Sequence, residues 1–251
     1  MRETRLIMGM PIEIEILGEH DAARAALEDA FAYLVAVDEE FSTYKEGSAI
    51  SRIDRGELSL RDASEDMREV FSLAEAAKQE TKGFFDVKRP DGHLDPSGVV
   101  KGWAVKNAAE RIREAGFEDF FVNAGGDIAS NGTNAGGKAW SVGIENPFNR
   151  EEIVKVVYPR GRGVATSGSY IRGAHIYDPH EPGKPLDEVK AITVIAPTVL
   201  RADILATAAF AMGKEGIAFI ESCPDCEAYQ IDASMTATLT SGFEKFTSPR
   251  S

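Results

Sequence analysis

The chain has 251 residues and is 43% hydrophobic, which is enough to build a substantial core. Its formal net charge of −13 argues against a general binder of nucleic acid or anionic membranes, because such proteins need a basic surface that displaces counterions. No apolar run approaches the roughly 18 residues that a bilayer span needs, and the first ten residues hold no apolar signal core. As written, the sequence predicts a cytoplasmic protein, or the mature segment of an exported one.

The first half of the chain combines one predicted strand with three predicted helices. Residues 11–18 alternate apolar and polar side chains with a period of two, which predicts a strand. Apolar residues recur at helical spacing in three later segments, which predicts helices over 21–41, 62–83 and 101–116.

Polar residues and glycines predict the ends of these helices. Asp21 is placed to cap the first, and Asp62 with Glu65 three positions on resembles a capping box for the second. Gly83 and Gly116 follow the last periodic residues of the second and third helices, where glycine commonly ends a helix.

The second half reads as mostly extended. Strands are predicted over 120–125, 140–147, 152–159, 163–170 and 191–197, separated by glycine, asparagine and proline turns. One helix, 198–212, interrupts them before Gly213, and the tail 227–246 reads as two closing strands. This order predicts an α+β fold with a mostly antiparallel sheet and flanking helices, forming a single domain over residues 1–251.

Common nucleotide-binding signatures are absent. No GxxxxGK[ST] motif occurs, and the glycines of VNAGGDI follow a predicted strand without opening a helix. The only two cysteines form a lone CPDC, which lacks the second ligand pair of a zinc site.

The stretch RADILAT places Asp203 and Thr207 four residues apart on a predicted helix, so their oxygens lie on one face. A carboxylate and a hydroxyl arranged in this way suit a hard cation such as Mg²⁺. A structural alternative is that Asp203 interacts with the helix dipole and Thr207 bonds back to a main-chain carbonyl.

The segment 83–105 holds two acids, Asp86 and Asp95, before a helix that Lys101 and Gly102 are expected to open. Free amides at a helix start favour a phosphate, and Lys101 would add a positive charge. The alternative is a loop with aspartate turns and a solvated lysine.

Two further segments carry candidate residues. Tyr44 after the first long helix can stack on a planar ring, although tyrosine at a helix exit is more often packing. The stretch 164–185 brings hydroxyl residues together with His175 and Asp178, and a histidine can remove a proton from an alcohol or serve as a hydrogen-bonded strand residue.

Taken in chain order, these segments resemble the ApbE family, the FAD:protein FMN transferases. The combination of HIxDPxxxGxP at 175–185 with ADxLAT at 202–207 is specific, and the resemblance runs from about Met8 to the closing strands. It implies an ApbE-like (T-fold-like) domain that, with Mg²⁺, splits FAD into AMP and an FMN moiety. That moiety becomes esterified through phosphate to a threonine or serine hydroxyl of an acceptor protein.

The resemblance also implies residue roles. Asp203 and Thr207 match the side-chain metal ligands, with the main-chain carbonyl of Gly98 as a third. His175 is the expected base for the acceptor hydroxyl, and Asp178 is expected to shape its loop or orient it. The positions that match FAD contacts are Met8, Tyr44, Phe84, Phe85, Asp86, Asp95, Lys101 and Ile176.

Several expectations stay open beside this one. The motif that is commonly MGT in the family is MGM here, ending in Met10, and the segment between Asp86 and Lys101 is shorter than usual. A Mg²⁺-dependent FAD pyrophosphatase would use the same metal and pocket, and a flavin binder without turnover is a third candidate. The stretch MTATLTS resembles an acceptor site with Thr238 at the modified position, although it also reads as a strand rich in threonine.

Overall fold

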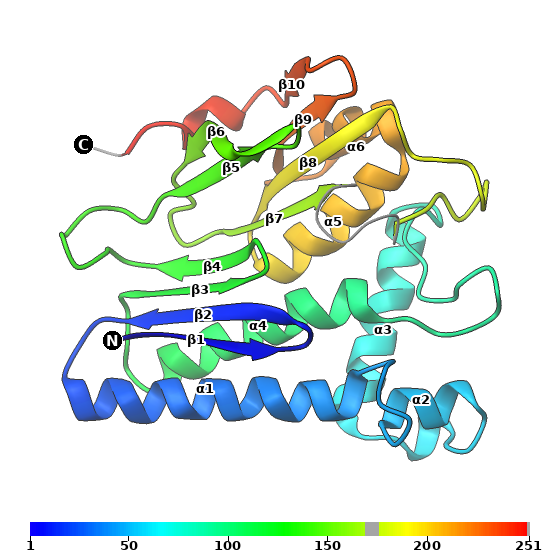
Figure 1. The fold of residues 1–251 in the computed structure, drawn as a ribbon, viewed down its shortest axis with the longest axis horizontal. Helices are drawn as coiled ribbons and strands as arrows, with labels where there is room; N and C mark the ends of the chain where they lie inside the picture. Colours follow the sequence, from blue (N-terminus) through cyan, green and yellow to red (C-terminus); the bar gives the residue numbers. More distant parts are fainter. Residues whose placement is uncertain (169–175, 250–251) are drawn as a thin grey trace.

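A computed structural model describes residues 1–168 and 176–249 of the chain. Its main element is an eight-stranded sheet in which all neighbouring strands are antiparallel, in the order β1-β2-β3-β4-β7-β8-β9-β10 (Figure 1). The strands are β1 (Arg2–Ile7), β2 (Met10–Ile16), β3 (Phe120–Ala124), β4 (Asp127–Asn131), β7 (Gly163–Gly168), β8 (Val189–Ala196), β9 (Glu227–Asp232) and β10 (Ala237–Leu239). A separate hairpin consists of β5 (Val142–Asn146) and β6 (Asn149–Val157).

Six helices accompany the sheet in the described part of the chain. They are α1 (His20–Phe41), α2 (Ala49–Asp54), α3 (Glu65–Glu80), α4 (Ser97–Glu114), α5 (Val199–Ala211) and α6 (Gly216–Ser222). Helices α4 and α5 pack against each other and against the sheet, α4 on β3 and β4 and α5 on β7 and β8, while α1 packs on α4 (Figure 1). The expected α+β fold with a mostly antiparallel sheet and flanking helices is confirmed.

The sheet follows the alternation that the sequence predicts. In β2 the side chains of Ile12, Ile14 and Ile16 are fully buried, while the residues between them face outward. The predicted strands over 163–170 and 191–197 correspond to β7 and β8, although residues 169 and 170 lie outside the described part. Strands β1 and β4 were missed by the sequence analysis, as were the short helices α2 and α6.

Two predicted N-caps are wrong. The N-cap of α1 is Glu19 rather than Asp21, because the Glu19 carboxylate accepts the main-chain amides of Asp21 and Ala22. Helix α3 is capped by Ser64, whose hydroxyl accepts the Met67 amide, so the expected capping box does not start the helix.

The helix expected to start at Lys101 starts one turn earlier. Ser97 is the first residue of α4, and Pro96 stands at its N-cap. The carboxylate of Asp95 accepts the amide of Ser97 at 3.1 Å, which occupies one of the free donors at this terminus. Lys101 therefore lies in the second turn of α4 and not at the helix start. Its side chain faces β4 and α5.

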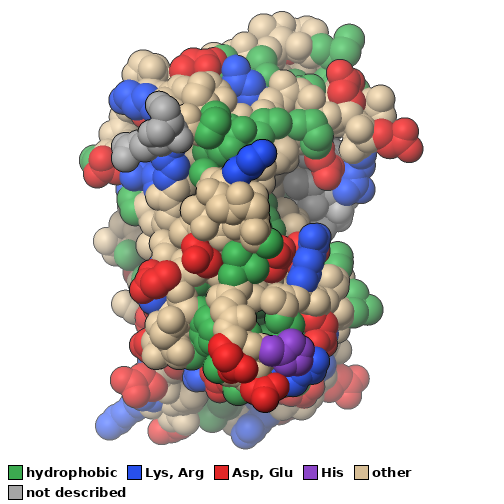
Figure 2. All heavy atoms as spheres, turned by 90° about the vertical axis from the view of Figure 1, so that its left-hand side faces the viewer, with side chains coloured by type: hydrophobic (Ala, Val, Ile, Leu, Met, Phe, Trp, Pro, Cys, Tyr) green, Lys and Arg blue, Asp and Glu red, His purple; other side chains and the backbone are tan. Residues whose placement is uncertain are grey.

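The visible surface carries charges of both signs. Figure 2 shows acidic and basic side chains interspersed over the face that lies to the left in Figure 1. None of the helices in the described ranges is both long and apolar enough to cross a bilayer.

Candidate active site

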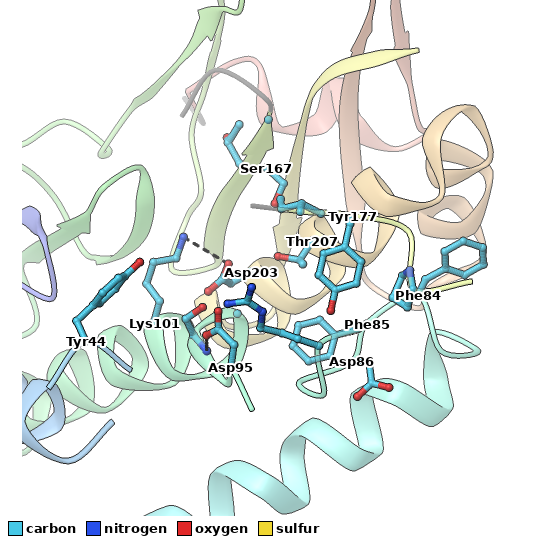
Figure 3. A pocket seen from close by; sticks show the side chains of 17 residues that line it. Tyr44, Phe84, Phe85, Asp86, Asp95, Lys101, Ser167, Tyr177, Asp203 and Thr207 are labelled. Atoms are coloured by element: carbon cyan, nitrogen blue, oxygen red, sulfur yellow. Dashed lines mark hydrogen bonds and ion pairs between the residues drawn. The ribbon is translucent and has the colours of Figure 1, made fainter. Parts of the chain in front are cut away.

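A cavity of about 340 Å³, called the central cavity below, opens where α4, α5, the end of β7 and the segment 176–179 meet (Figure 3). Its lining includes nine residues that the sequence analysis singled out: Tyr44, Phe84, Phe85, Asp86, Asp95, Gly98, Lys101, Asp203 and Thr207. Ile176, another predicted FAD contact, also lines it. The cavity thus unites segments that are more than 150 residues apart in the sequence.

Asp203 and Thr207 both face the central cavity from one side of α5, as their spacing predicts (Figure 3). The Asp203 side chain is 4% exposed, and its Oδ2 accepts the main-chain amide of Gly102 at 3.0 Å. Gly98 lies beside this pair, since a Cβ added to it would stand 4.0 Å from Thr207 Cγ2. The Asp203 carboxylate, the Thr207 side chain and the main chain of Gly98 thus form one wall of the cavity.

Lys101 connects this wall to a residue that the sequence analysis did not choose. Its Nζ lies 2.6 Å from Asp127 Oδ2 and 3.5 Å from Asp203 Oδ1. Asp127 is the first residue of β4 and is 1% exposed, directly behind the glycine turn of VNAGGDI. Burial, and then repulsion by Asp127, raise the pKa of Asp203.

Aromatic side chains form another part of the wall. Tyr44 is 96% exposed at the rim, whereas Phe85 is buried on another side of the cavity, where a Cβ added to Gly98 would stand 3.0 Å from its ring (Figure 3). Phe84 and Tyr177 complete this apolar part of the lining. Flat aromatic surface beside a charged pocket suits a ligand that joins planar rings to phosphate.

The two predicted acids of the 83–105 segment are held by main-chain and side-chain partners. Asp86 forms an ion pair with Lys78 at 2.7 Å and accepts the Lys88 amide at 2.9 Å. Asp95 accepts the Ser97 amide at the start of α4. Both line the central cavity while their carboxylates also fix the loop between α3 and α4.

Residues 176–180 pack against the turn at Gly83 through His180. The Asp178 carboxylate accepts the main-chain amide of His180 at 2.8 Å and so shapes this turn. The His180 ring packs edge-on against Phe84 with centroids 4.6 Å apart, and its Nε2 lies 3.1 Å from the Lys82 carbonyl oxygen. His175, the expected base, lies outside the described residues.

Two other expected positions lie apart from the central cavity. Met8 sits in the β1–β2 turn with a φ of 55° and packs against the main core, and it is absent from the lining of the central cavity. Thr238 lies in the edge strand β10, where it pairs with Gln230.

The family model for the ApbE family matches residues 8–89 and 87–230 of the chain. The chain belongs to the ApbE family. The FAD:protein FMN transferase of Vibrio cholerae is 32% identical over 170 residues, which cover 63% of this chain and 49% of the relative. That of Salmonella typhimurium is 34% identical over 142 residues, covering 53% of this chain and 40% of the relative. The chain thus spans about half the length of these curated relatives or less.

Solved ApbE structures share the fold over nearly the whole chain. The flavin transferase ApbE of Vibrio cholerae superposes with a TM-score of 0.86 at 24% identity, covering 98% of both chains. The ApbE protein of Thermotoga maritima gives a TM-score of 0.87 at 20% identity, covering 99% of both chains. At these identities the likeness establishes the ApbE fold.

The oxygen ligands available around Asp203 fit a hard divalent cation. Asp127 and Asp203 bring two buried carboxyl groups into contact, and in the described ranges the Asp127 oxygens have only the Asp203 carboxyl and the Lys101 ammonium as close polar neighbours. One lysine stands beside two acidic side chains. Within the same ranges no three His, Cys, Asp or Glu side chains form a metal cluster, so a cation here needs hydroxyl, carbonyl, water or substrate oxygens, which Mg²⁺ accepts.

Sequence reasoning missed several residues of the site. Asp127 was overlooked because attention in VNAGGDI went to its glycines, which do not open a helix, whereas its aspartate opens a strand. Thr166 and Ser167 line the cavity from β7, and Arg89 lines it from the loop after Asp86. The hydroxyl residues of VATSG were a usable signal, while the place of Arg89 depends on how that loop folds back.

The contacts of Asp54 with His93 and Leu94, called the Asp54 tether below, give a pH-dependent prediction. Asp54 Oδ2 lies 2.7 Å from His93 Nδ1, and Asp54 Oδ1 accepts the Leu94 amide at 2.8 Å, which ties the loop before α4 to α2. The Asp54 hydrogen bond raises the pKa of His93, and the His93 hydrogen bond lowers the pKa of Asp54. The histidine contribution is therefore complete below about pH 6.5 and is lost as pH rises through the higher folded pKa. The Asp54 contribution is present above about pH 3.9 and is lost as pH falls through its lowered folded pKa.

We expect amide protection of residues 86–96 to fall as pH rises above neutrality, after correction for intrinsic exchange. Hydrogen exchange followed by mass spectrometry measures this, and His93→Gln should remove the pH dependence. His20→Gln is the matched control, because His20 contacts only its neighbour Asp21 among the described side-chain hydrogen bonds. An unchanged pH profile in His93→Gln would contradict the tether.

Proposed function

We propose that this chain is an FAD:protein FMN transferase. The single observation that carries the proposal is the meeting of Asp203, Thr207, Gly98 and Lys101 beside an aromatic wall in the central cavity. Membership of the ApbE family and the names of its relatives in Vibrio and Salmonella support the same activity. The reaction would join FMN through a phosphoester to a threonine or serine of an acceptor protein and release AMP.

Asp203, Thr207 and the Gly98 carbonyl would hold Mg²⁺. When bound there, the cation would neutralise charge on the pyrophosphate of FAD as a Lewis acid. The remaining roles belong to the chain itself. Lys101 would approach the same phosphates with its ammonium, and the buried walls would keep bulk water from the reacting phosphorus.

Bond changes follow from the substrate chemistry. The acceptor hydroxyl oxygen would bond to the FMN phosphorus, the bond from that phosphorus to the bridging oxygen would break, and AMP would leave with that oxygen. The hydroxyl proton needs a base, and His175 stays our candidate. Asp178 supports this role by fixing the turn that follows, through its bond to the His180 amide.

The FAD rings are proposed to lie on the aromatic part of the wall, with Tyr44, Phe84, Phe85 and Ile176 as contacts. Asp86 and Asp95 would border the same ligand. Met8 stays a candidate contact from the β1–β2 turn, although it does not line the central cavity.

We also propose that the chain works as one domain. The sheet continues without a break from β1 to β10, and α4 from the first half packs on α5 from the second. The proposed metal site, formed by Asp203, Thr207 and Gly98 and called the metal wall below, lies where α4 meets α5, so neither half would hold the complete site.

Replacing the exposed Tyr44 by alanine should raise the KM for FAD about tenfold and change kcat less than threefold. Ring stacking contributes on the order of 1–1.5 kcal/mol, which corresponds to about tenfold in affinity. Tyr44 is not one of the proposed metal ligands, so its loss should change the chemical step little. Steady-state transfer kinetics measure this, with Tyr44→Phe as the control that keeps the ring. Unchanged KM in Tyr44→Ala would exclude stacking at this position.

The function itself is tested by incubating the protein with FAD, Mg²⁺ and an acceptor domain that carries a threonine flavinylation site. Mass spectrometry should show one FMN phosphoester on that threonine and an equal amount of AMP. Free FMN and AMP without an adduct, with several acceptors, would instead establish an FAD pyrophosphatase. Intact FAD would leave a flavin binder, and the same spectra show whether Thr238 of the enzyme gains FMN.

A further inference from the structure

The buried triad of Lys101, Asp127 and Asp203 contains one basic and two acidic side chains. The Lys101 ammonium is unequally placed, at 2.6 Å from Asp127 Oδ2 and 3.5 Å from Asp203 Oδ1. The first distance is a close ion pair, while the second is beyond a well-formed hydrogen bond. Of the two carboxylates, Asp127 is therefore the closer partner of Lys101, although Asp203 is within its reach.

The backbone fixes the two carboxylates while the lysine can shift. Asp203 is held by the Gly102 amide at Oδ2, which leaves Oδ1 toward the ammonium and the cavity. Asp127 begins β4 immediately after the turn at Gly125 and Gly126, with φ values of 59° and 101°, so its position is set by the sheet. The Lys101 side chain is flexible and 15% exposed, whereas Asp127 is 1% exposed.

We propose that Lys101 is an internal competitor of the divalent cation for Asp203, and that Asp127 is a positioning residue that holds the ammonium away from Asp203. This rests on the proposed metal wall and goes beyond it by assigning Asp127 a role. With Asp127 present, Oδ1 of Asp203 stays open to a cation. Without the Asp127 charge, the ammonium would move onto Asp203 and close the site.

The charges make opposite predictions for two single variants. Lys101→Met removes the competitor, so Mn²⁺ should bind about tenfold more tightly to the protein without FAD. Asp127→Asn releases the ammonium, so Mn²⁺ should bind at least about tenfold more weakly. Lys106→Met is the matched control, because Lys106 lies on the same helix and pairs with Glu110 at 2.8 Å, and it should leave Mn²⁺ binding unchanged.

A double-mutant cycle separates positioning from simple loss of charge. If Asp127 acts through Lys101, Asp127→Asn should cost less than about threefold in Mn²⁺ affinity once Lys101→Met is present. An equal cost in both backgrounds would overturn the proposal. Should Lys101→Met alone fail to fold, Asp127→Asn and the double variant still decide, because the double variant must bind Mn²⁺ more tightly than Asp127→Asn.

The measurement is electron paramagnetic resonance of Mn²⁺ titrated into each folded variant, with no FAD and no acceptor present. An Asp203→Asn variant shows which part of the binding depends on the proposed wall. If Mn²⁺ binding depends on Asp203 but Asp127→Asn costs the same affinity with and without Lys101→Met, only the role assigned to Asp127 is overturned. Absence of any Asp203-dependent binding overturns this inference and the proposed metal wall together, whereas failure of the transfer assay with intact Mn²⁺ binding overturns only the transferase.

Discussion

Replacing Asp203 by asparagine should lower the rate of FMN transfer by about a thousandfold or more, while the protein unfolds at the same temperature or higher without metal. The two effects have opposite signs because the carboxylate is nearly fully buried. Asparagine keeps an oxygen for the Gly102 amide but removes a negative charge that Asp127 repels. A residue with this pattern contributes to chemistry at the expense of stability.

The measurement pairs transfer kinetics with calorimetric unfolding in buffer that contains a chelator. Asp21→Asn is a suitable control, because the Asp21 side chain is 94% exposed and remote from the central cavity, and its activity should equal that of the wild type. Loss of activity together with a lower unfolding temperature in Asp203→Asn would point to a structural role. Full activity would remove Asp203 from the proposed metal wall.

The part of the site that lies on one helix could be predicted from the sequence. Asp203 and Thr207 share a face of α5 because a helix brings residues four apart together, whatever the rest of the fold does. The alternation in residues 11–18 likewise determined which side of β2 is buried. Both features follow from local periodicity.

The partners of Lys101 could not be predicted in this way. Lys101 was expected at a helix start facing a phosphate, but α4 begins at Ser97 and turns the lysine toward Asp127 and Asp203. The contact depends on where β4 enters the sheet and on how closely α4 and α5 pack. Neither is encoded in the spacing of any single segment.

The docking of His180 on the Gly83 turn is a second example. The sequence analysis assigned no role to His180, whereas its ring packs on Phe84, nearly a hundred residues earlier. Gly83 allows this approach, because a Cβ there would stand 3.1 Å from the His180 ring and the φ of 86° favours glycine. The family resemblance predicted that both segments serve one site, and the structure gives the contact that joins them.

Gly102 links the fold to the site, and its replacement by alanine should damage both. A Cβ at this position would lie 2.9 Å from Asp203 Cβ and 2.9 Å from the Leu200 Cα, so α4 and α5 must separate. We expect the free energy of unfolding to fall by about 1–3 kcal/mol, despite the higher helix propensity of alanine. Transfer should fall at least about tenfold, because separation of the helices moves Asp203 relative to Lys101 and lengthens its bond to the Gly102 amide.

Urea unfolding and transfer kinetics on the same preparation measure the two effects. Gly47→Ala is the matched control, since a Cβ at Gly47 meets no atom within 4 Å, and it should leave stability and activity near those of the wild type. Normal transfer in a destabilised Gly102→Ala protein would show that the site tolerates movement between α4 and α5. A loss of transfer larger than the stability change explains, measured far below the urea midpoint, is expected instead, because the carboxylate, the ammonium and the hydroxyl must share one cavity wall to act on one phosphate.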